Sequence, residues 1–400
     1  MRLKNYNDPI YGFISIPTPF ISTIIQESVF QRLRRIQQMG FSHYVFNGAT
    51  HHRFAHALGA MHLMRKTLDI LNTKGTPISE SEREAAMIAI LLHDLGHGPF
   101  SHALEGILIE NVSHEFWSLS LMKMLNDKYN GKLSLAIQMF EGKYKRPFFN
   151  QLISSQLDMD RLDYLKRDSF YSGVTEGNIS TDRIIAMLRV HQDELVVEKK
   201  GMYSIEKFLL ARRLMYWSVY LHKTSYVAEE VLKRIILRAR ELLQNGDSIQ
   251  TSPDLLYFLS AKRSSKRKLD IKHYAAIDDV DILSMIKAGV AHQDRVYSSL
   301  CEMVLNRRLP KIEVSNEPFS HDFIEKQKYK AMSKLGISAQ EVHYFVFDGK
   351  MKNMAYNLEQ SPIILIDKNE GTKELLAGSD ESNLKMLTKA VTKYYCCYPK

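Results

Sequence analysis

Helical spacing of apolar residues over most of the chain is the feature that most constrains the fold. From about residue 20 to residue 305, the apolar positions recur with the period of helices. Turn signals interrupt them at Gly40, Gly48, Thr76-Pro77, 96–99 and Gly173. Such a pattern predicts packed helices rather than an extended sheet. We therefore predict a mostly α fold, with one helical domain over residues 1–305.

Short extended segments interrupt this helical pattern at two places. Residues 8–12 have the composition of a turn that feeds a short extended segment. Residues 194–198 and 202–205 flank the polar turn 199–201, which is typical of a β-hairpin. We expect both features to sit within the helical domain.

The last quarter of the chain has a different pattern. Alternating segments at 342–347 and 363–366 are separated by polar turns and followed by a helix-like stretch over 381–392. This pattern predicts a small α+β C-terminal domain over residues 306–400. Nothing in it indicates chemistry.

Composition limits the class of protein and its partners. The 400 residues are 45% hydrophobic and 25% charged, which is ordinary for a globular protein of one or two domains. The first residues lack the apolar run of a signal peptide, and no stretch of about 18 uncharged apolar residues occurs. We therefore expect a cytoplasmic protein with no membrane partner. The net charge of +9 suits an anionic partner, which includes small phosphates as readily as nucleic acid.

A strongly apolar helix is predicted over residues 82–92, and it ends abruptly at His93-Asp94. A neutral imidazole beside a carboxylate supplies one nitrogen and one oxygen ligand to a divalent ion. The three cysteines show no metal-binding pair, so nitrogen and oxygen would hold any metal. An isolated pair of this kind is more often a hydrogen-bonded helix cap. Other segments of the sequence distinguish between these two interpretations.

Upstream, residues 50–58 begin a second predicted helix, in which Arg53 and His56 lie one turn apart on one face. A guanidinium near a metal ligand suits a site that binds phosphate, because metal and cation neutralise different oxygens. His52 and His62 are competing ligands in the same helix.

Downstream, residues 157–168 form a predicted helix with Ser155 as its N-cap. Asp160, Tyr164 and Asp168 follow at i, i+4 and i+8 and therefore share one face. A solvated acidic face is the alternative interpretation, which the tyrosine disfavours.

A further helix over 208–223 places Arg212, Tyr216, Tyr220 and Lys223 in one stripe of cations and aromatic rings. Cations suit phosphates and tyrosines suit a sugar or a base. The alternative is that the stripe merely rims a buried apolar face.

Taken together, three segments carry a resemblance to a known family. The runs 31–40, 44–56 and 93–102, with the later aspartate, resemble the H…HD…D signature of HD-superfamily phosphohydrolases. They are most similar to the deoxynucleoside triphosphate triphosphohydrolases, and the resemblance spans roughly residues 8–225. It implies an HD-domain helical bundle.

The resemblance also implies roles for individual residues. The metal ligands would be His56, His93, Asp94 and Asp160. His97 and His102 would contact phosphate and transfer protons, with Glu105 and His114 as a relay. Arg53, Tyr164, Arg212 and Lys223 would bind phosphates, and Gln38, Asp168 and Tyr220 would hold the deoxyribose. Met39 and Arg161 depart from the family pattern, at positions that contact the sugar and a phosphate.

The function implied is hydrolysis of a deoxynucleoside triphosphate (dNTP) to a deoxynucleoside and triphosphate. The cofactor would be one divalent metal ion among Mn, Fe, Ni, Co, Zn and Mg, and the protein would be a homo-oligomer, dimeric or larger. One alternative is an HD phosphohydrolase or phosphodiesterase for another nucleotide or phosphate ester. Another is a nucleotide-sensing or nucleic-acid-binding regulator, although the dNTPase function does not require nucleic acid.

Overall fold

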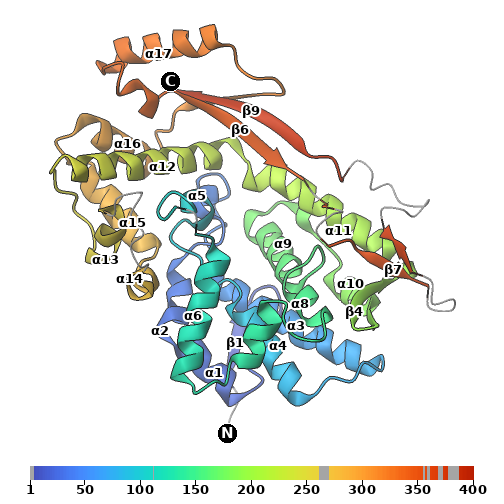
Figure 1. Cartoon of the computed structure of the whole chain (residues 1–400). Coiled ribbons are helices and arrows are strands. Elements are labelled where there is room, and N and C mark those ends of the chain that lie inside the picture. The colour runs from blue at the N-terminus through green and yellow to red at the C-terminus, as the bar shows by residue number, and fades with distance from the viewer. Residues whose placement is uncertain are drawn as a thin grey trace.

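The computed structural model describes residues 4–110, 112–260, 270–354, 356–357, 361–367, 373–376 and 387–400. Helices make up most of this part of the chain, and the few strands form small sheets (Figure 1). The predicted mostly α fold with an α+β C-terminal region is therefore confirmed. Among the described residues, no helix is both long enough and apolar enough to cross a membrane.

The N-terminus forms a hairpin of β1 (Asn5–Asp8) and β2 (Gly12–Ser15), as the predicted turn required. Asp8 Oδ1 accepts hydrogen bonds from the backbone N–H groups of Ile10 and Tyr11, at 2.9 and 3.1 Å. These bonds stabilise the tight turn.

Three packed helices form the centre of the molecule. α3 (Arg53–Thr73) contacts both α4 (Glu80–Leu92) and α9 (Met159–Ser172), and α12 (Lys223–Gln244) crosses above them in Figure 1. Shorter elements surround them: α1 (Pro19–Gln26), α2 (Ser28–Gln31), η1 (Arg32–Arg35), η2 (Gly40–Tyr44), α5 (Ser101–Leu104), α6 (His114–Lys128), α7 (Ser134–Phe140), α8 (Phe148–Ile153), η3 (Thr175–Gly177) and α10 (Thr181–Met187).

The N-terminus of α9 differs from the prediction. Asp158, not Ser155, is the N-cap, and its side chain accepts from the backbone N–H of Arg161. The backbone N–H of Ser155 instead donates to Asp158. The helix therefore starts at Met159, which places Asp160 in its first turn, near the positive end of the helix dipole.

The predicted second hairpin exists, but with different strands. β3 (Leu188–His191) pairs with β4 (Glu194–Glu198) across a two-residue turn at Gln192 and Asp193, both of which have positive φ. Residues 202–205, predicted as a strand, begin α11 (Met202–Met215) after η4 (Lys199–Gly201). Met202, Ile205 and Leu209 lie buried on one helical face, so the period of this segment is helical rather than alternating.

The predicted helix over 208–223 is not continuous. α11 continues into a π-helical turn, η5 (Tyr216–Tyr220). The helix ends there, and α12 begins at Lys223. His222 caps α12 with extended backbone. Lys223 therefore does not continue the stripe of Arg212, Tyr216 and Tyr220.

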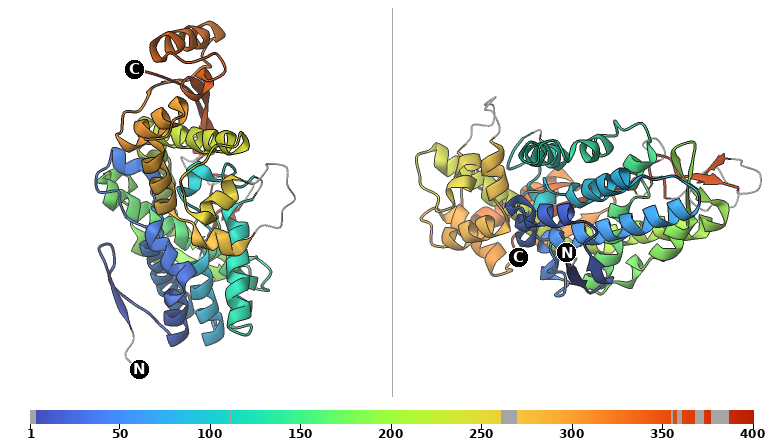
Figure 2. Two further views of the ribbon diagram at one scale, coloured as in Figure 1. Left: turned by 90° about the vertical axis from the view of Figure 1, so that its left-hand side faces the viewer. Right: turned by 90° about the horizontal axis from the view of Figure 1, so that it is seen from below.

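The rest of the helical region consists of α13 (Pro253–Leu259), α14 (Ile271–Ala276), α15 (Asp279–Gly289) and α16 (Arg295–Leu305). Beyond it lie β5 (Lys311–Ser315), α17 (His321–Leu335), η6 (Val342–Tyr344), β6 (Phe347–Asn353), β7 (Ile364–Ile366), β8 (Lys373–Leu375) and β9 (Val391–Tyr398). α17 and the N-terminal hairpin lie at opposite ends of the molecule (Figure 2).

The C-terminal strands form two sheets. β9 pairs antiparallel with β5 and β6, whereas β7 pairs parallel with β4 and antiparallel with β8. The strand predicted at 363–366 is confirmed. In the segment 342–347, predicted as a strand, residues 342–344 form the 3-10 turn η6, and the strand begins only at Phe347. The predicted helix over 381–392 is wrong at Val391 and Thr392, which start β9, while 381–386 lie outside the described residues.

Two large clusters of buried apolar side chains hold these elements together. One joins α1, α3, α4, α9 and α11. The other joins α12 and α16 to C-terminal residues such as Phe345, Phe347 and Tyr395. This shared core crosses residue 306, and the division of the chain into two domains there stays a prediction.

Candidate metal centre and nucleotide pocket

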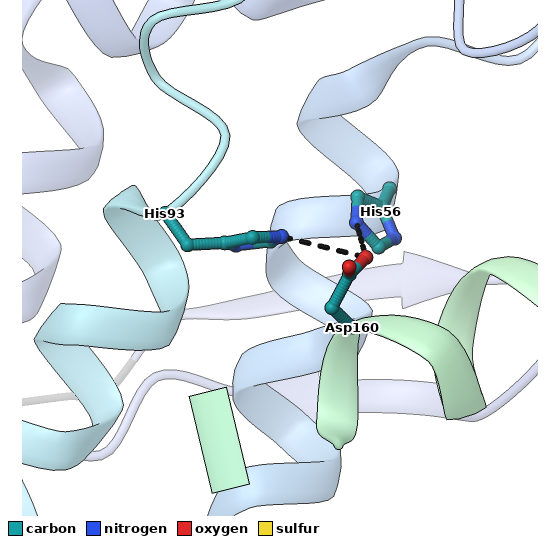
Figure 3. Close-up of side chains that lie close together, drawn as sticks. All are labelled: His56, His93 and Asp160. Atoms are coloured by element: carbon teal, nitrogen blue, oxygen red, sulfur yellow. Dashed lines mark ion pairs between the residues drawn. The ribbon is translucent and has the colours of Figure 1, made fainter. Parts of the chain in front are cut away.

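Three predicted ligands converge from three helices. His56 lies in the first turn of α3, His93 immediately follows α4, and Asp160 lies in the first turn of α9. One ligand atom from each lies within 4.8 Å of the others, and the side chains point toward one another (Figure 3). The Nε2 atoms of His56 and His93 are 3.1 and 3.5 Å from Asp160 Oδ1.

Asp94 stands beside these three residues. Its Oδ1 is 3.3 Å from His93 Nε2, its Oδ2 is 3.7 Å from His56 Nε2, and Arg53 Nη1 donates to the same Oδ2 at 2.5 Å. Burial alone would raise the pKa of Asp94, but His97, His93 and Arg53 hold it well below its usual range. The fourth predicted ligand is therefore an ionised carboxylate next to the other three.

The donor set fits a divalent metal ion. His56 Nδ1 donates to Asp163 Oδ2 at 2.7 Å, and His93 Nδ1 donates to the carbonyl of Ile90 at 2.6 Å. With both Nδ1 atoms used as donors, the two Nε2 lone pairs face the centre of the site. Both Nε2 atoms are buried, and neither makes a hydrogen bond within the described structure. Such lone pairs beside carboxylates are what a metal of borderline hardness binds.

Electrostatics favour a cation at the same point. Burial opposes the charged form of His56, yet the carboxylates of Asp160 and Asp163 raise its pKa to about 10. His56 and His93 in turn hold the pKa of the buried Asp160 far below its usual range.

Asp163, which the sequence analysis missed, orients His56. It also accepts from Arg167, whose Nη1 reaches Asp8 Oδ2 of the N-terminal hairpin at 2.8 Å. This contact requires α3 and α9 to approach closely at Gly59. A Cβ at Gly59 would lie 2.0 Å from Asp163 Oδ1 and 2.3 Å from Arg167 Nη2. The only signal for Asp163 was its place one turn after Asp160.

A cavity of about 480 Å³ opens next to Asp94 and Asp160. Most of the other predicted site residues line it: Gln38, Met39, Arg53, His97, His114, Arg161, Tyr164, Asp168, Arg212 and Tyr220. Lys223 does not line the cavity and is exposed at the start of α12. His102 lies in α5, but its side chain is outside the described residues.

A row of titratable groups leads from Asp94 along one wall. His97 Nε2 is 3.1 Å from Asp94 Oδ1, His97 stacks on His114 at 4.1 Å between ring centroids, and His114 Nδ1 is 2.9 Å from Glu105 Oε1. Burial and Arg53 hold the pKa of His97 well below its usual value, against the opposing charge of Asp94. The hydrogen bond from His114 lowers the pKa of Glu105 to about 2.

Another wall of the cavity holds a polar cluster around Asp168. Its Oδ1 lies 2.7 Å from Nε2 of the buried His51, and its Oδ2 accepts from the Tyr220 hydroxyl at 2.7 Å. Gln38 Oε1 is buried with no hydrogen-bond partner in the described structure. The sequence analysis did not identify His51. It named His52 and His62 as competing metal ligands. Neither belongs to the ligand cluster found among the described residues, and His62 stacks on Tyr11.

Arginine side chains also line the cavity. Arg161 pairs with Asp158, and Arg212 Nη1 donates to Gln156 Oε1 at 3.1 Å. The Nε–H donors of both side chains are buried without a partner in the described structure. Asp279 of α15 holds the surrounding loops by accepting from the backbone N–H groups of Gln37 and Phe100, each at 2.8 Å. Burial raises the pKa of Asp279 to about 6.

The His, His, Asp cluster beside a cavity lined by arginines suits a metal-dependent phosphohydrolase. Comparison with known proteins agrees: residues 53–167 match the HD domain, and residues 179–257 match the HD associated region. The crystal structure of a phosphohydrolase from Bacteroides thetaiotaomicron superposes with a TM-score of 0.95, at 46% identity over 100% of both chains. The chain belongs to the family of HD-domain phosphohydrolases.

Two relatives in other organisms are similar over much of the chain. YwfO of Bacillus subtilis, an uncharacterised protein, is 33% identical over 93% of this chain and 87% of its own length. The deoxynucleoside triphosphate triphosphohydrolase SAMHD1 homolog of Dictyostelium discoideum is 28% identical over 67% of this chain. The match covers 55% of that protein, so this chain spans about half of its length.

Proposed function

We propose that this protein hydrolyses dNTPs to deoxynucleosides and triphosphate. The observation that carries the proposal is a single cavity lined by two chemically distinct sets of residues. Asp94 and Asp160 border it at the metal centre, and Gln38, Asp168 and Tyr220 border it elsewhere with groups suited to a sugar hydroxyl. The similarity to a protein named as a dNTP triphosphohydrolase supports the same substrate class.

We infer that His56, His93, Asp94 and Asp160 hold the metal ion. When bound, a divalent metal lowers the pKa of a water and polarises a phosphate oxygen. Arg53, Arg161 and Arg212 would neutralise the phosphate oxygens and the charge that develops on the departing triphosphate.

Proton transfer would use the row from His97 to Glu105. A neutral His97 has a ring nitrogen that can take up a proton, and the His114–Glu105 pair favours a positive charge at the end of the row. His102 stays a candidate for protonating the leaving 5′-oxygen. The Asp168 carboxylate would accept a hydrogen bond from the 3′-hydroxyl, and the Gln38 side-chain amide would donate one to the hydroxyl oxygen.

A substrate panel tests this function. dNTPs, NTPs, 2′,3′-dideoxy-NTPs, monophosphates and cyclic nucleotides are incubated with Mn, Mg, Fe, Co, Ni or Zn, and triphosphate, pyrophosphate and orthophosphate are separated by ion exchange. We expect triphosphate from one or more dNTPs, and poorer turnover of NTPs because Met39 lies where a 2′-hydroxyl would intrude. Dideoxy substrates should lose roughly tenfold or more in kcat/KM, because the hydrogen bonds of Asp168 and Gln38 to the 3′-hydroxyl would be lost.

Two alternatives give different results. Orthophosphate as the sole product, or indifference to the 3′-hydroxyl, would favour a phosphohydrolase or phosphodiesterase for another ester. No turnover with any metal, together with steeply salt-dependent binding of single strands, would favour a regulator.

We also propose that the protein is a dimer or larger. Tyr203, Leu210 and Leu214 expose 69%, 47% and 39% of their surface on α11, which gives an apolar face for a second copy. A monomeric mass by light scattering at micromolar concentration would contradict this assignment.

A further inference from the structure

One face of α12 forms part of the cavity wall. Tyr226, Glu229 and Lys233 line the cavity and lie at i, i+3 and i+7, so they project from the same side of the helix. Glu229 lies against the loop that carries Gln38 and Met39. A Cβ at Gly40 would be 3.3 Å from Glu229 Oε1 and 4.0 Å from the ring of Phe100.

Glu229 differs from its neighbour Glu230 in its interactions. Within the described part of the chain, its carboxyl group makes no hydrogen bond or ion pair, whereas the adjacent Glu230 binds Lys233 at 2.6 Å and Arg234 at 3.0 Å. Burial raises the pKa of Glu229 to about 7, against the opposing charge of Lys233. A desolvated carboxyl group without a partner destabilises the fold, and groups of this kind are characteristic of binding sites.

Glu229 lines the same cavity as the groups proposed to hold the sugar. Gln38 is followed by Met39 and Gly40, and Tyr220 is followed by Leu221 and then Tyr226, all of which line the same cavity. Leu221 and Tyr226 add apolar surface to the lining of this cavity, and the carboxyl group of Glu229 and the ammonium group of Lys233 lie on the same face of α12 as Tyr226. Apolar surfaces with a polar edge suit a planar nucleobase.

We propose that Glu229 reads the nucleobase of the substrate and that guanine is the preferred base. Guanine presents two adjacent N–H donors, at N1 and N2, next to the O6 acceptor. A carboxylate accepts two parallel N–H bonds, and the ammonium of Lys233 has further protons for O6. Adenine and cytosine would place a ring-nitrogen lone pair against the carboxylate, and thymine offers a single N–H. This inference rests on the proposed dNTPase function.

The isosteric Glu229→Gln variant tests the assignment, because an amide replaces one acceptor by a donor. We measure kcat/KM for triphosphate release from dGTP, dITP, dATP and dCTP. The wild type should prefer dGTP over dITP, which lacks the N2 donors, by roughly 10-fold. Glu229→Gln should lower turnover of dGTP roughly 10- to 100-fold and leave dATP and dCTP unchanged or improved. The matched control is Glu241→Gln on the same helix, whose carboxylate is 47% exposed and pairs with Arg238.

The outcomes separate the two proposals. If the wild type releases triphosphate but Glu229→Gln keeps the dGTP to dATP ratio, base reading by Glu229 is overturned and the dNTPase function stands. If no dNTP is hydrolysed, the dNTPase function falls, and calorimetric binding of deoxyguanosine and deoxyadenosine to metal-free protein decides the role of Glu229. A selective loss of deoxyguanosine binding in Glu229→Gln supports it, and equal affinities in variant and wild type overturn it. Circular dichroism confirms that each variant is folded.

Discussion

His56 Nδ1 and Asp163 Oδ2 form a buried hydrogen bond of 2.7 Å, and this bond decides which imidazole nitrogen faces the metal centre. The carboxylate fixes the proton on Nδ1, so Nε2 presents its lone pair to the site. Arg167 holds Asp163 in turn. The geometry of one ligand therefore depends on a residue that does not reach the metal.

Replacing Asp163 by Asn should weaken metal binding without removing a ligand. The loss of a charged acceptor behind a ligating histidine typically costs about 10- to 100-fold in metal affinity. Competition with a chelator measures the change. Asp182→Asn is the control, because its carboxylate is 76% exposed and pairs only with Lys66 among the interactions found. Equal metal affinities in the two variants would contradict the orienting role.

His93→Ala and Asp94→Ala should each abolish bound metal and turnover together, while leaving a folded protein. Each variant removes one predicted ligand from a metal site formed by residues at the ends of three helices. Elemental analysis and circular dichroism check the two parts of the prediction. Full metal occupancy in both variants would rule out these residues as ligands.

Arg53→Ala should weaken triphosphate binding more than metal binding. A buried guanidinium-phosphate pair contributes on the order of 2 kcal/mol, which corresponds to roughly 30-fold in affinity. Because Arg53 also donates to Asp94, Arg53→Lys serves as a comparison that keeps the charge. Unchanged kinetics in Arg53→Ala would assign this side chain a purely structural role.

Gly59→Ala should destabilise the protein and reduce metal occupancy at the same time. The new methyl group would overlap Asp163 and Arg167, and such overpacking costs about 1–3 kcal/mol or more. Chemical unfolding and elemental analysis provide the two readouts. Ala55→Ser, at a half-buried position one turn earlier, should change neither, and a similar loss in both variants would refute the specific contact.

Glu229 should make stability depend on pH. Its pKa is raised in the folded protein, so the folded state binds the proton more tightly than the unfolded state does. The resulting stabilisation is present below the pKa of an unfolded glutamate and is lost as pH rises through about 7. Between pH 4.5 and pH 8, the free energy of unfolding of Glu229→Gln should rise by up to about 3 kcal/mol relative to that of the wild type. Chemical unfolding measures this free energy across the pH range. The same pH dependence in the two proteins would contradict the prediction.

Local patterns in the sequence predicted the mostly α fold and the candidate ligands. His93 and Asp94 stood out because an apolar helix ends at them, and Asp160, Tyr164 and Asp168 stood out because helical geometry places them on one face. Where local signals competed, the prediction failed. Residues 202–205 are compatible with either a strand or a helix, and burial of Met202 and Ile205 against neighbouring elements selected the helix.

The tertiary structure alone decided how the site is supported. Asp163 lies 107 positions from His56, Asp168 lies 117 from His51, and Asp279 lies 179 from Phe100. A hydrogen bond between such distant residues leaves no periodic mark in the sequence, because it depends on how whole helices pack. Glu229 resembles any glutamate of an amphipathic helix in the sequence, and only the packing of α12 against Gly40 places its carboxyl group in the cavity without a partner. The sequence by itself determined which residues are candidates for the chemistry, and the packing of α3, α9 and α12 decided how these side chains are oriented.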